Sequence, residues 1–295
     1  MMKLRLSLKN LVRCGLNICL LLCLFLGCSS STVPTYSKSE VDKSIQKVLL
    51  DEYKLEVKTR LVGQTLWIYI PLEDLFEKAK KPEKYPERFQ ISENENEFKY
   101  GLLKLNYLIR AVPETEKTQD YKFNKKAMEN ITNVWEVLRR VIFSMDKKTR
   151  DGIKFYCLVA ADIKNGFEIK ELIYYQDMFK VTYRFISPGE YQHRVSYDSG
   201  VSVNIIGDKE GKHLEYKDIS LDEFVAYQIK HRINLKFQKP EVKHNVDIDK
   251  EIAKIIIESL KIYGFKDIDT AELNNLLTNN KMTLNRGEIF SSSMD

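Results

Sequence analysis

The sequence has few of the residues that commonly reveal a covalent framework or a chemical activity. Its 295 residues include five cysteines and four histidines. Only Cys28 and Cys157 lie beyond Gly27, which excludes a framework of several intrachain disulfides. After the first 27 residues, no strongly apolar run approaches the roughly 20 residues that cross a bilayer. The body of the protein is therefore expected to be soluble and to depend on packing for its stability.

An excess of charge is also missing from most of the chain. The formal net charge is +5, but four positive charges and no acid lie in the first 27 residues, which leaves +1 for the remainder. A nearly neutral body has no general attraction for nucleic acid, and we expect no nucleic-acid partner.

The first 27 residues have the pattern of a signal peptide. Residues 1–15 are basic, and residues 16–26 (LNICLLLCLFL) are apolar except for Asn17. A core of about eleven residues fits the 7–15 of a signal peptide. Lysine and arginine before such a core favour retention of that end on the cytoplasmic side.

The end of this segment resembles the lipobox of bacterial lipoproteins. Gly27 and Cys28 match the small residue and the cysteine of that motif, whereas Phe25 and Leu26 differ from its usual residues. The resemblance implies a lipid on Cys28, which becomes the new N-terminus and carries two or three acyl chains. More than one chain is what stable anchoring requires. Secretory cleavage after Ser29 and an uncleaved anchor remain alternatives.

The residues after Cys28 predict a flexible tether over 28–37. In lipoproteins, a serine such as Ser29 in place of aspartate is typical of sorting to the outer membrane, where a cell has two membranes. The resemblance thus implies a membrane partner through acylated Cys28. The body is expected to meet an envelope protein, a glycan or a lipid, and no cofactor is expected.

Hydrophobic periodicity predicts an α+β fold, with antiparallel sheets built from helix-plus-hairpin units and covered by helices. The predicted N-terminal unit, 38–112, contains a helix over 38–53 that opens with a capping box at Ser37, a hairpin over 55–72, a charged loop over 77–97 and strands over 98–112.

A polar connector over 113–120 leads to a second predicted unit, 121–240. It begins with a helix over 124–146 and a hairpin over 153–175. The hairpin turn is Asn165-Gly166, a pair preferred where both turn residues have positive φ. Strands over 179–186, 191–206 and 213–217 and a helix over 221–235 follow. The C-terminal region, 241–280, is predicted to be helical. One helix has an apolar stripe over 248–260 and ends at Gly264, and a shorter helix covers 270–278. A polar tail over 281–295 follows. Whether the two helix-plus-hairpin units are a true duplication is left open.

Motifs of known chemistry are incomplete. The stretch IIGDKEGKH (205–213) lacks the spacing of a phosphate-binding loop, and YDSGV (197–201) lacks the first glycine of a nucleophile elbow. No two histidines have the helical spacing of a zinc site, although His193 and His213 could meet if their strands paired. His231 is predicted to be exposed. We expect no metal site and name no catalytic residue.

Other reactive side chains have simpler structural interpretations. Cys157 lies in an apolar strand, where a thiol behaves as a small hydrophobe. Asp162, Glu168, Glu171 and Asp177 surround the second hairpin. Paired carboxylates can hydrolyse a glycan when their separation is fixed, but solvated strand faces explain them more simply.

Aromatic residues of the predicted strands form the candidate binding surface. It comprises Trp67, Tyr69, Tyr174 and Tyr175. Trp67 and Tyr69 share the strand face opposite Ile68. The alternative is that these rings pack beneath a helix or a second sheet layer.

The sequence favours a lipid-anchored lipoprotein of the bacterial cell envelope with a non-enzymatic binding or assembly role. Two alternatives remain: an envelope hydrolase with a site of scattered Asp, Glu and His, and a carrier of an apolar ligand. A carrier requires an internal cavity between helix and sheet.

Overall fold

The computed structural model describes residues 40–145, 152–238 and 245–291. The elements of the first half are α2 (Val41–Tyr53), β1 (Lys58–Val62), β2 (Thr65–Leu72), β3 (Phe76–Lys99), β4 (Leu102–Phe123) and α3 (Lys125–Phe143). Those of the second half are β5 (Phe155–Asp162), β6 (Phe167–Tyr174), α5 (Tyr175–Thr182), α6 (Pro188–Gln192), β7 (Ser196–Val201), η2 (Val203–Ile205), α7 (Leu221–Gln238), α8 (Ile248–Tyr263), β8 (Thr270–Asn275), β9 (Asn280–Asn285) and α9 (Arg286–Phe290).

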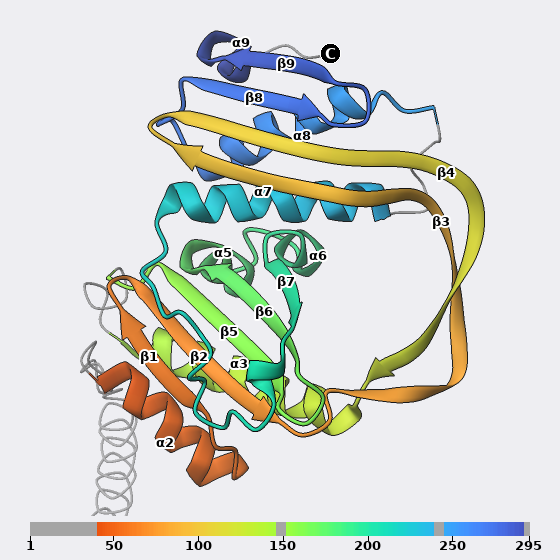
Figure 1. Cartoon of the computed structure of the whole chain (residues 1–295). Helices are drawn as coiled ribbons and strands as arrows, with labels where there is room; N and C mark the ends of the chain where they lie inside the picture. Colours follow the sequence, from red (N-terminus) through yellow and green to blue (C-terminus); the bar gives the residue numbers. More distant parts are fainter. Residues whose placement is uncertain (1–39, 146–151, 239–244, 292–295) are drawn as a thin grey trace, which may run out of the picture.

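Two mixed sheets and their covering helices make up an α+β fold. One sheet has the strand order β1-β2-β5-β6-β7 and the other the order β3-β4-β8-β9. Helix α7 lies between the two sheets (Figure 1). The α+β class is confirmed, but the expectation of purely antiparallel pairing is wrong. β2 runs parallel to β5, and β4 runs parallel to β8, because long connections separate each pair and allow the chain to return in the same direction.

Helices α2 and α3 cover one face of the five-stranded sheet. The buried stripe of α3, which includes Val134, Leu138 and Val141, packs with Ile68 and Leu158 of the sheet. The Asn124 side chain caps α3 by accepting the backbone N–H groups of two residues in its first turn. These two helices were predicted from their apolar period, while the capping box at Ser37 lies outside the described residues.

A second core fills the space between the two sheets. Trp67 and Val159 enter it from the five-stranded sheet, and Leu105 enters it from the four-stranded one. Helices α7 and α8 supply many of its other apolar side chains. Asn96 and Asn94 of β3 donate hydrogen bonds to backbone carbonyls of α7, which fix the second sheet to this helix.

The long strands β3 and β4 connect the two sheets as an arch, which we define as residues 76–88 and 111–123 (Figure 1). Cross-strand ion pairs join Glu77 to Lys122, Lys84 to Glu116 and Glu87 to Lys117. Most side chains of the arch are exposed. The predicted loop over 77–97 and connector over 113–120 are thus wrong. A ribbon solvated on both faces has no apolar alternation to reveal it.

Further differences concern the second half of the chain. The predicted strand over 179–186 begins within α5, whose Tyr175, Met178, Phe179 and Thr182 have helical spacing. The predicted helix over 270–278 is largely strand β8, in which every second residue is buried. No regular element covers 213–217, and of 191–206 only 196–201 forms a strand.

The predicted hairpins are present, with one altered turn. β5 and β6 are joined by residues 163–166, and of these only Gly166 has positive φ. The Asp162 carboxylate accepts the backbone N–H groups of Lys164 and Asn165 and so holds this longer turn. Because β2 pairs with β5, both predicted helix-plus-hairpin units contribute to one sheet. Helices α7 and α8, and the left-handed C-cap at Gly264, match the prediction.

Candidate functional site

Two cavities meet beneath α7, one on either side of the edge strand β7. The larger has a volume of about 870 Å³ and the smaller about 200 Å³. Both are lined by Tyr197 and Asp198 of β7 and by His231 and Asn234 of α7. The free edge of the five-stranded sheet therefore separates two spaces with different linings.

The larger cavity is mainly apolar. Its floor is the sheet face that also packs against α3, and its sides come from α3, the arch and α7. The apolar residues that line it are Ile70, Phe76, Phe123, Met128, Ile131, Leu158, Ala160, Phe167, Ile169 and Leu235. Polar groups from the arch and from α7, including Gln119 and Gln238, complete the lining. This lining matches sites that bury a molecule with a large apolar part.

An aromatic cluster stands where the arch joins the sheet. The ring centroid of Phe76 lies 4.8 Å from that of Phe123 and 5.1 Å from that of Phe167. Phe123 and Met128 are each about two-fifths exposed, so apolar surface extends from the cavity to the solvent. A ligand can thus make its first apolar contacts at this end.

Glu171 supplies one of the carboxyl groups that line the larger cavity, the other being that of Asp198. Its Oε2 accepts a hydrogen bond of 3.1 Å from Nε1 of Trp135 on α3. Burial raises the pKa of Glu171 to about 7, although the Trp135 bond lowers it. The buried Tyr191 hydroxyl has no hydrogen-bond partner among the described residues, and burial together with the charge of Glu171 raises its pKa. The carboxyl can therefore keep its proton, and act as a hydrogen-bond donor, at a higher pH than an exposed glutamate.

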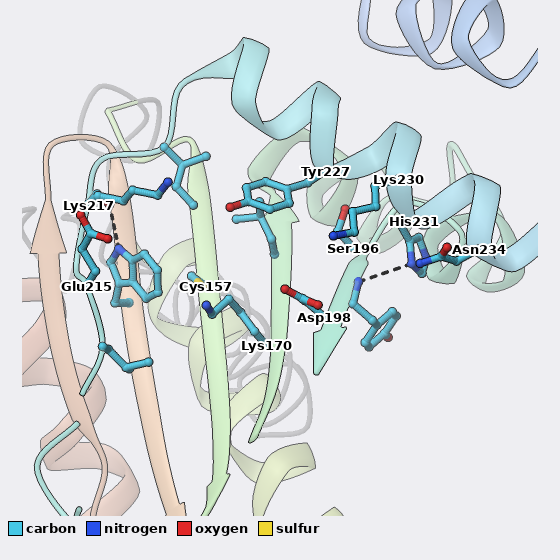
Figure 2. Close-up of a pocket in the computed structure, with 15 residues that line it drawn as sticks. Cys157, Lys170, Ser196, Asp198, Glu215, Lys217, Tyr227, Lys230, His231 and Asn234 are labelled. Atoms are coloured by element: carbon cyan, nitrogen blue, oxygen red, sulfur yellow. Dashed lines mark hydrogen bonds between the residues drawn. The ribbon is translucent and has the colours of Figure 1, made fainter. Parts of the chain in front are cut away.

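The smaller cavity lies on the opposite face of β6, between the sheet and α7. Figure 2 shows Lys170 and Asp198 pointing into the space beneath the helix. The two residues are directly opposite each other in the β6–β7 register. The Lys170 ammonium lies 5.9 Å from the ring centroid of Trp67, which is a cation–π distance. Charged groups thus stand beside an aromatic wall in this cavity.

His231 lies where the two cavities meet. It is 6% exposed, and its Nδ1 accepts a long hydrogen bond of 3.5 Å from the backbone N–H of Tyr197. Its Nε2 has no partner in the part of the chain that the structure describes. Burial lowers its pKa to about 4, as do the charges of Arg232 and His193. The predicted exposure of His231 is wrong, because α7 is enclosed between the two sheets.

The structure does not bring the predicted aromatic surface together. Trp67 and Tyr69 are 3% and 0% exposed, and each uses its polar atom on a backbone carbonyl, of Lys217 and Asp208 respectively. Tyr174 stacks with Phe155 in the core between the sheets. Tyr175 is buried in the core beside α3. These side chains pack beneath helices and the second sheet, as the alternative interpretation of the sequence predicts. Of the four, only Trp67 lines the smaller cavity.

The acids around the second hairpin have separate partners. Asp162 holds the β5–β6 turn, and Asp177 pairs with Arg194 at 2.9 Å. Glu168 lies 2.9 Å from Nε2 of His213, whose Nδ1 lies 2.6 Å from Asp208. With both ring nitrogens occupied by carboxylates, this histidine has none free to take a proton from a nucleophile. No group of three or more His, Cys, Asp or Glu that could hold a metal occurs within the described ranges.

Sequence reasoning missed the role of four residues in these cavities. Lys170 and Ile169 occupy neighbouring positions of β6 and face different cavities, which alternation alone could have indicated. That Gln119 and Phe123 form a cavity wall could not be inferred, because the arch was predicted as loop. Cys28, the predicted lipid attachment site, lies outside the described residues.

Comparison with known proteins adds no identity. No protein-family model, no curated protein and no solved structure matches this chain. Over the described residues, the chain has no helix with the length and apolar character needed to span a membrane.

Proposed function

We propose that the chain is a binding protein of the bacterial cell envelope, held at a membrane by acylated Cys28, and that its larger cavity receives an apolar ligand. The observation that carries the binding role is the cavity of about 870 Å³ beside the sheet. Ligand sites typically measure about 300–1,000 Å³ and have mostly apolar linings with a few placed polar groups. The anchor rests on the sequence around Gly27 and Cys28.

Glu171 gives the apolar cavity one point of polar recognition. Trp135 holds one carboxyl oxygen, so the orientation of the group is fixed. In its protonated form the carboxyl donates a hydrogen bond to a carbonyl or ether oxygen of a ligand. In its ionised form it accepts one from an amide or a hydroxyl. The ligand supported best is therefore a molecule with a long apolar part and at least one polar group.

Binding is tested with the neutral fluorescent probe N-phenyl-1-naphthylamine and the full chain. The probe should become fluorescent with a saturable, stoichiometric increase. Ile169→Trp places a larger side chain on the cavity wall and should weaken probe binding at least tenfold. Leu50→Trp makes a comparable change at a half-exposed position of α2 that does not line the cavity, and should leave binding unchanged. Absence of saturable binding, or equal loss in both variants, would refute the binding site.

The anchor is tested separately in cells that express the chain. Cys28→Ala should release the body from the membrane fraction into the soluble fraction, and mass spectrometry of the wild-type N-terminus should find acylated Cys28. An unmodified chain that begins at Ser30, or a chain that retains residue 1, would contradict the proposed anchor. Binding of the probe does not depend on this result.

A further inference from the structure

Strand β7 ends the five-stranded sheet, and within the described residues no further strand pairs with its outer edge. In the strand order it pairs with β6 alone. The backbone N–H of Tyr197 points away from β6, because it reaches His231 on α7. Backbone groups alternate in direction along a strand, so those of Ser199 and Val201 also point outward. The Ser199 N–H donates a hydrogen bond of 3.0 Å to the carboxylate of its neighbour Asp198. The outward groups offered to a partner are therefore the C=O of Ser199 and the N–H and C=O of Val201.

Exposed apolar side chains continue from this edge. Val201 and Val203 are 80% and 79% exposed, and Ile206 is 54% exposed. Natural proteins usually protect a free edge with charge, proline, a bulge or a covering element, because an open edge pairs with other chains. Here α7 covers the start of β7, whereas Val201 at its end, and Val203 and Ile206 just after it, present β-branched apolar side chains to solvent. Such a patch beside a free edge indicates an interaction site.

The larger cavity runs beside the same edge. Tyr197, Asp198 and Ser199 of β7 line it, and Phe123 and Gln119 line it from the arch. A segment placed along β7 would therefore have the sheet edge on one side and apolar side chains within reach. This arrangement offers two kinds of contact at once: directional backbone hydrogen bonds and an apolar space for side chains.

We infer that the natural ligand is an extended, apolar polypeptide segment that adds to β7 as a further strand and places alternate side chains in the larger cavity. This inference rests on the proposed binding function and specifies its ligand. An acyl chain fills an apolar cavity equally well, but it has no N–H and C=O groups to match the outward C=O of Ser199 and the outward N–H and C=O of Val201. A polypeptide strand satisfies both the edge and the cavity, in the manner of strand addition.

The test uses a fluorescein-labelled peptide of seven alternating threonine and valine residues with the full chain. Binding should be saturable by fluorescence anisotropy, and the peptide should displace N-phenyl-1-naphthylamine. Val201→Pro removes an outward N–H at a position where an edge strand tolerates proline, and it should weaken peptide binding at least tenfold. Val201→Thr keeps the N–H and a β-branched side chain, and it should bind the peptide like the wild type. Equal peptide affinity in the two variants would overturn the inference.

Two methylated peptides repeat the test without altering the protein. In an added strand, the N–H groups of alternate residues face the sheet while the others face away. N-methylation of all valines, or of all threonines, should therefore have unequal effects: one peptide loses affinity at least tenfold and the other does not. Equal affinity of both methylated peptides would exclude backbone pairing.

The outcomes separate the ligand class from the binding function. Saturable probe binding without peptide binding would overturn the polypeptide inference, leave the proposed function standing and favour an acyl ligand. Absence of both would refute the proposed function as well. Val201 does not line the larger cavity. Retained probe binding by Val201→Pro therefore shows that the variant is folded, and a loss of peptide binding in that variant supports the edge contact.

Discussion

Replacement of Glu171 by glutamine should stabilise the protein above neutral pH and have little effect in acid. Burial raises the pKa of this carboxyl from 4.5 to about 7, so the folded protein holds a proton that the unfolded chain releases between these values. The contribution of the protonated carboxyl is fully present below pH 4.5 and is lost as the pH rises to 7. Glutamine is neutral throughout and keeps an oxygen that can accept the Trp135 N–H.

The size of the effect follows from the shift. One pKa unit corresponds to about 1.4 kcal/mol, and the pKa rises from 4.5 to about 7. Glu171→Gln should therefore gain at most about 3.5 kcal/mol of unfolding free energy at pH 8, relative to its effect at pH 4. The part of the carboxyl that faces the cavity retains some solvent, which makes this value an upper limit.

Urea unfolding at several pH values from 4 to 9, on wild type and variant, gives the difference directly. The other titrating groups are common to both proteins and cancel. Glu97→Gln changes an exposed carboxylate of β3 and should produce no such pH-dependent difference. A Glu171→Gln difference that stays constant with pH, or one that shrinks as the pH rises, would refute the assignment of a buried, protonated carboxyl.

Three other predictions concern the stability and accessibility of the body. Gly63→Ala should lower the free energy of unfolding in urea by about 1–3 kcal/mol, because Gly63 has φ of +58° and an added Cβ would lie 2.0 Å from Oδ2 of Asp218. A change below about 0.5 kcal/mol would show that the turn is not constrained. Ile68→Ala should lower the free energy of unfolding by about 2–5 kcal/mol in the same assay, because Ile68 is fully buried between the sheet and the helices α2 and α3. An unchanged unfolding midpoint would contradict the burial of Ile68. Cys157 should resist iodoacetamide at pH 8 until urea unfolds the chain, because burial raises the pKa of its thiol to about 12; peptide mass spectrometry that finds equal labelling in folded and unfolded protein would contradict its burial.

The elements with one buried face could be predicted from the sequence. The stripe of α3 and the hairpin of β5 and β6 have the apolar period that burial imposes, and the structure contains both. The arch gives no such signal, because both of its faces meet water and its stability comes from backbone pairing and cross-strand ion pairs. Residues 179–182 show the opposite failure: β-branched and aromatic residues favour a strand, but Phe179 packs among helical neighbours in the core.

The candidate site was less accessible to sequence reasoning than the fold. The aromatic residues selected from the strands, such as Tyr69, are core residues, because a ring on a strand face can pack beneath α7 as easily as it can bind a ligand. The larger cavity joins side chains from β5, β6, α3, α7 and the arch. Its existence depends on the parallel pairing of β2 with β5, which no local pattern specifies.

The same parallel pairing has a consequence for how the chain acquires its structure. The bond from the Leu75 N–H to Asp162 spans 87 residues, and the bond from the Gln64 N–H to Asp218 spans 154. Closing such loops loses chain entropy before any contact is gained, which slows folding. During synthesis, the residues of β2 emerge well before those of its neighbour β5. The run from Thr65 to Ile70, which is fully buried in the folded protein, then has no strand β5 to pair with. We expect docking of these two strands to be the slowest step of folding, and the intermediate that precedes it to be the species most prone to aggregate.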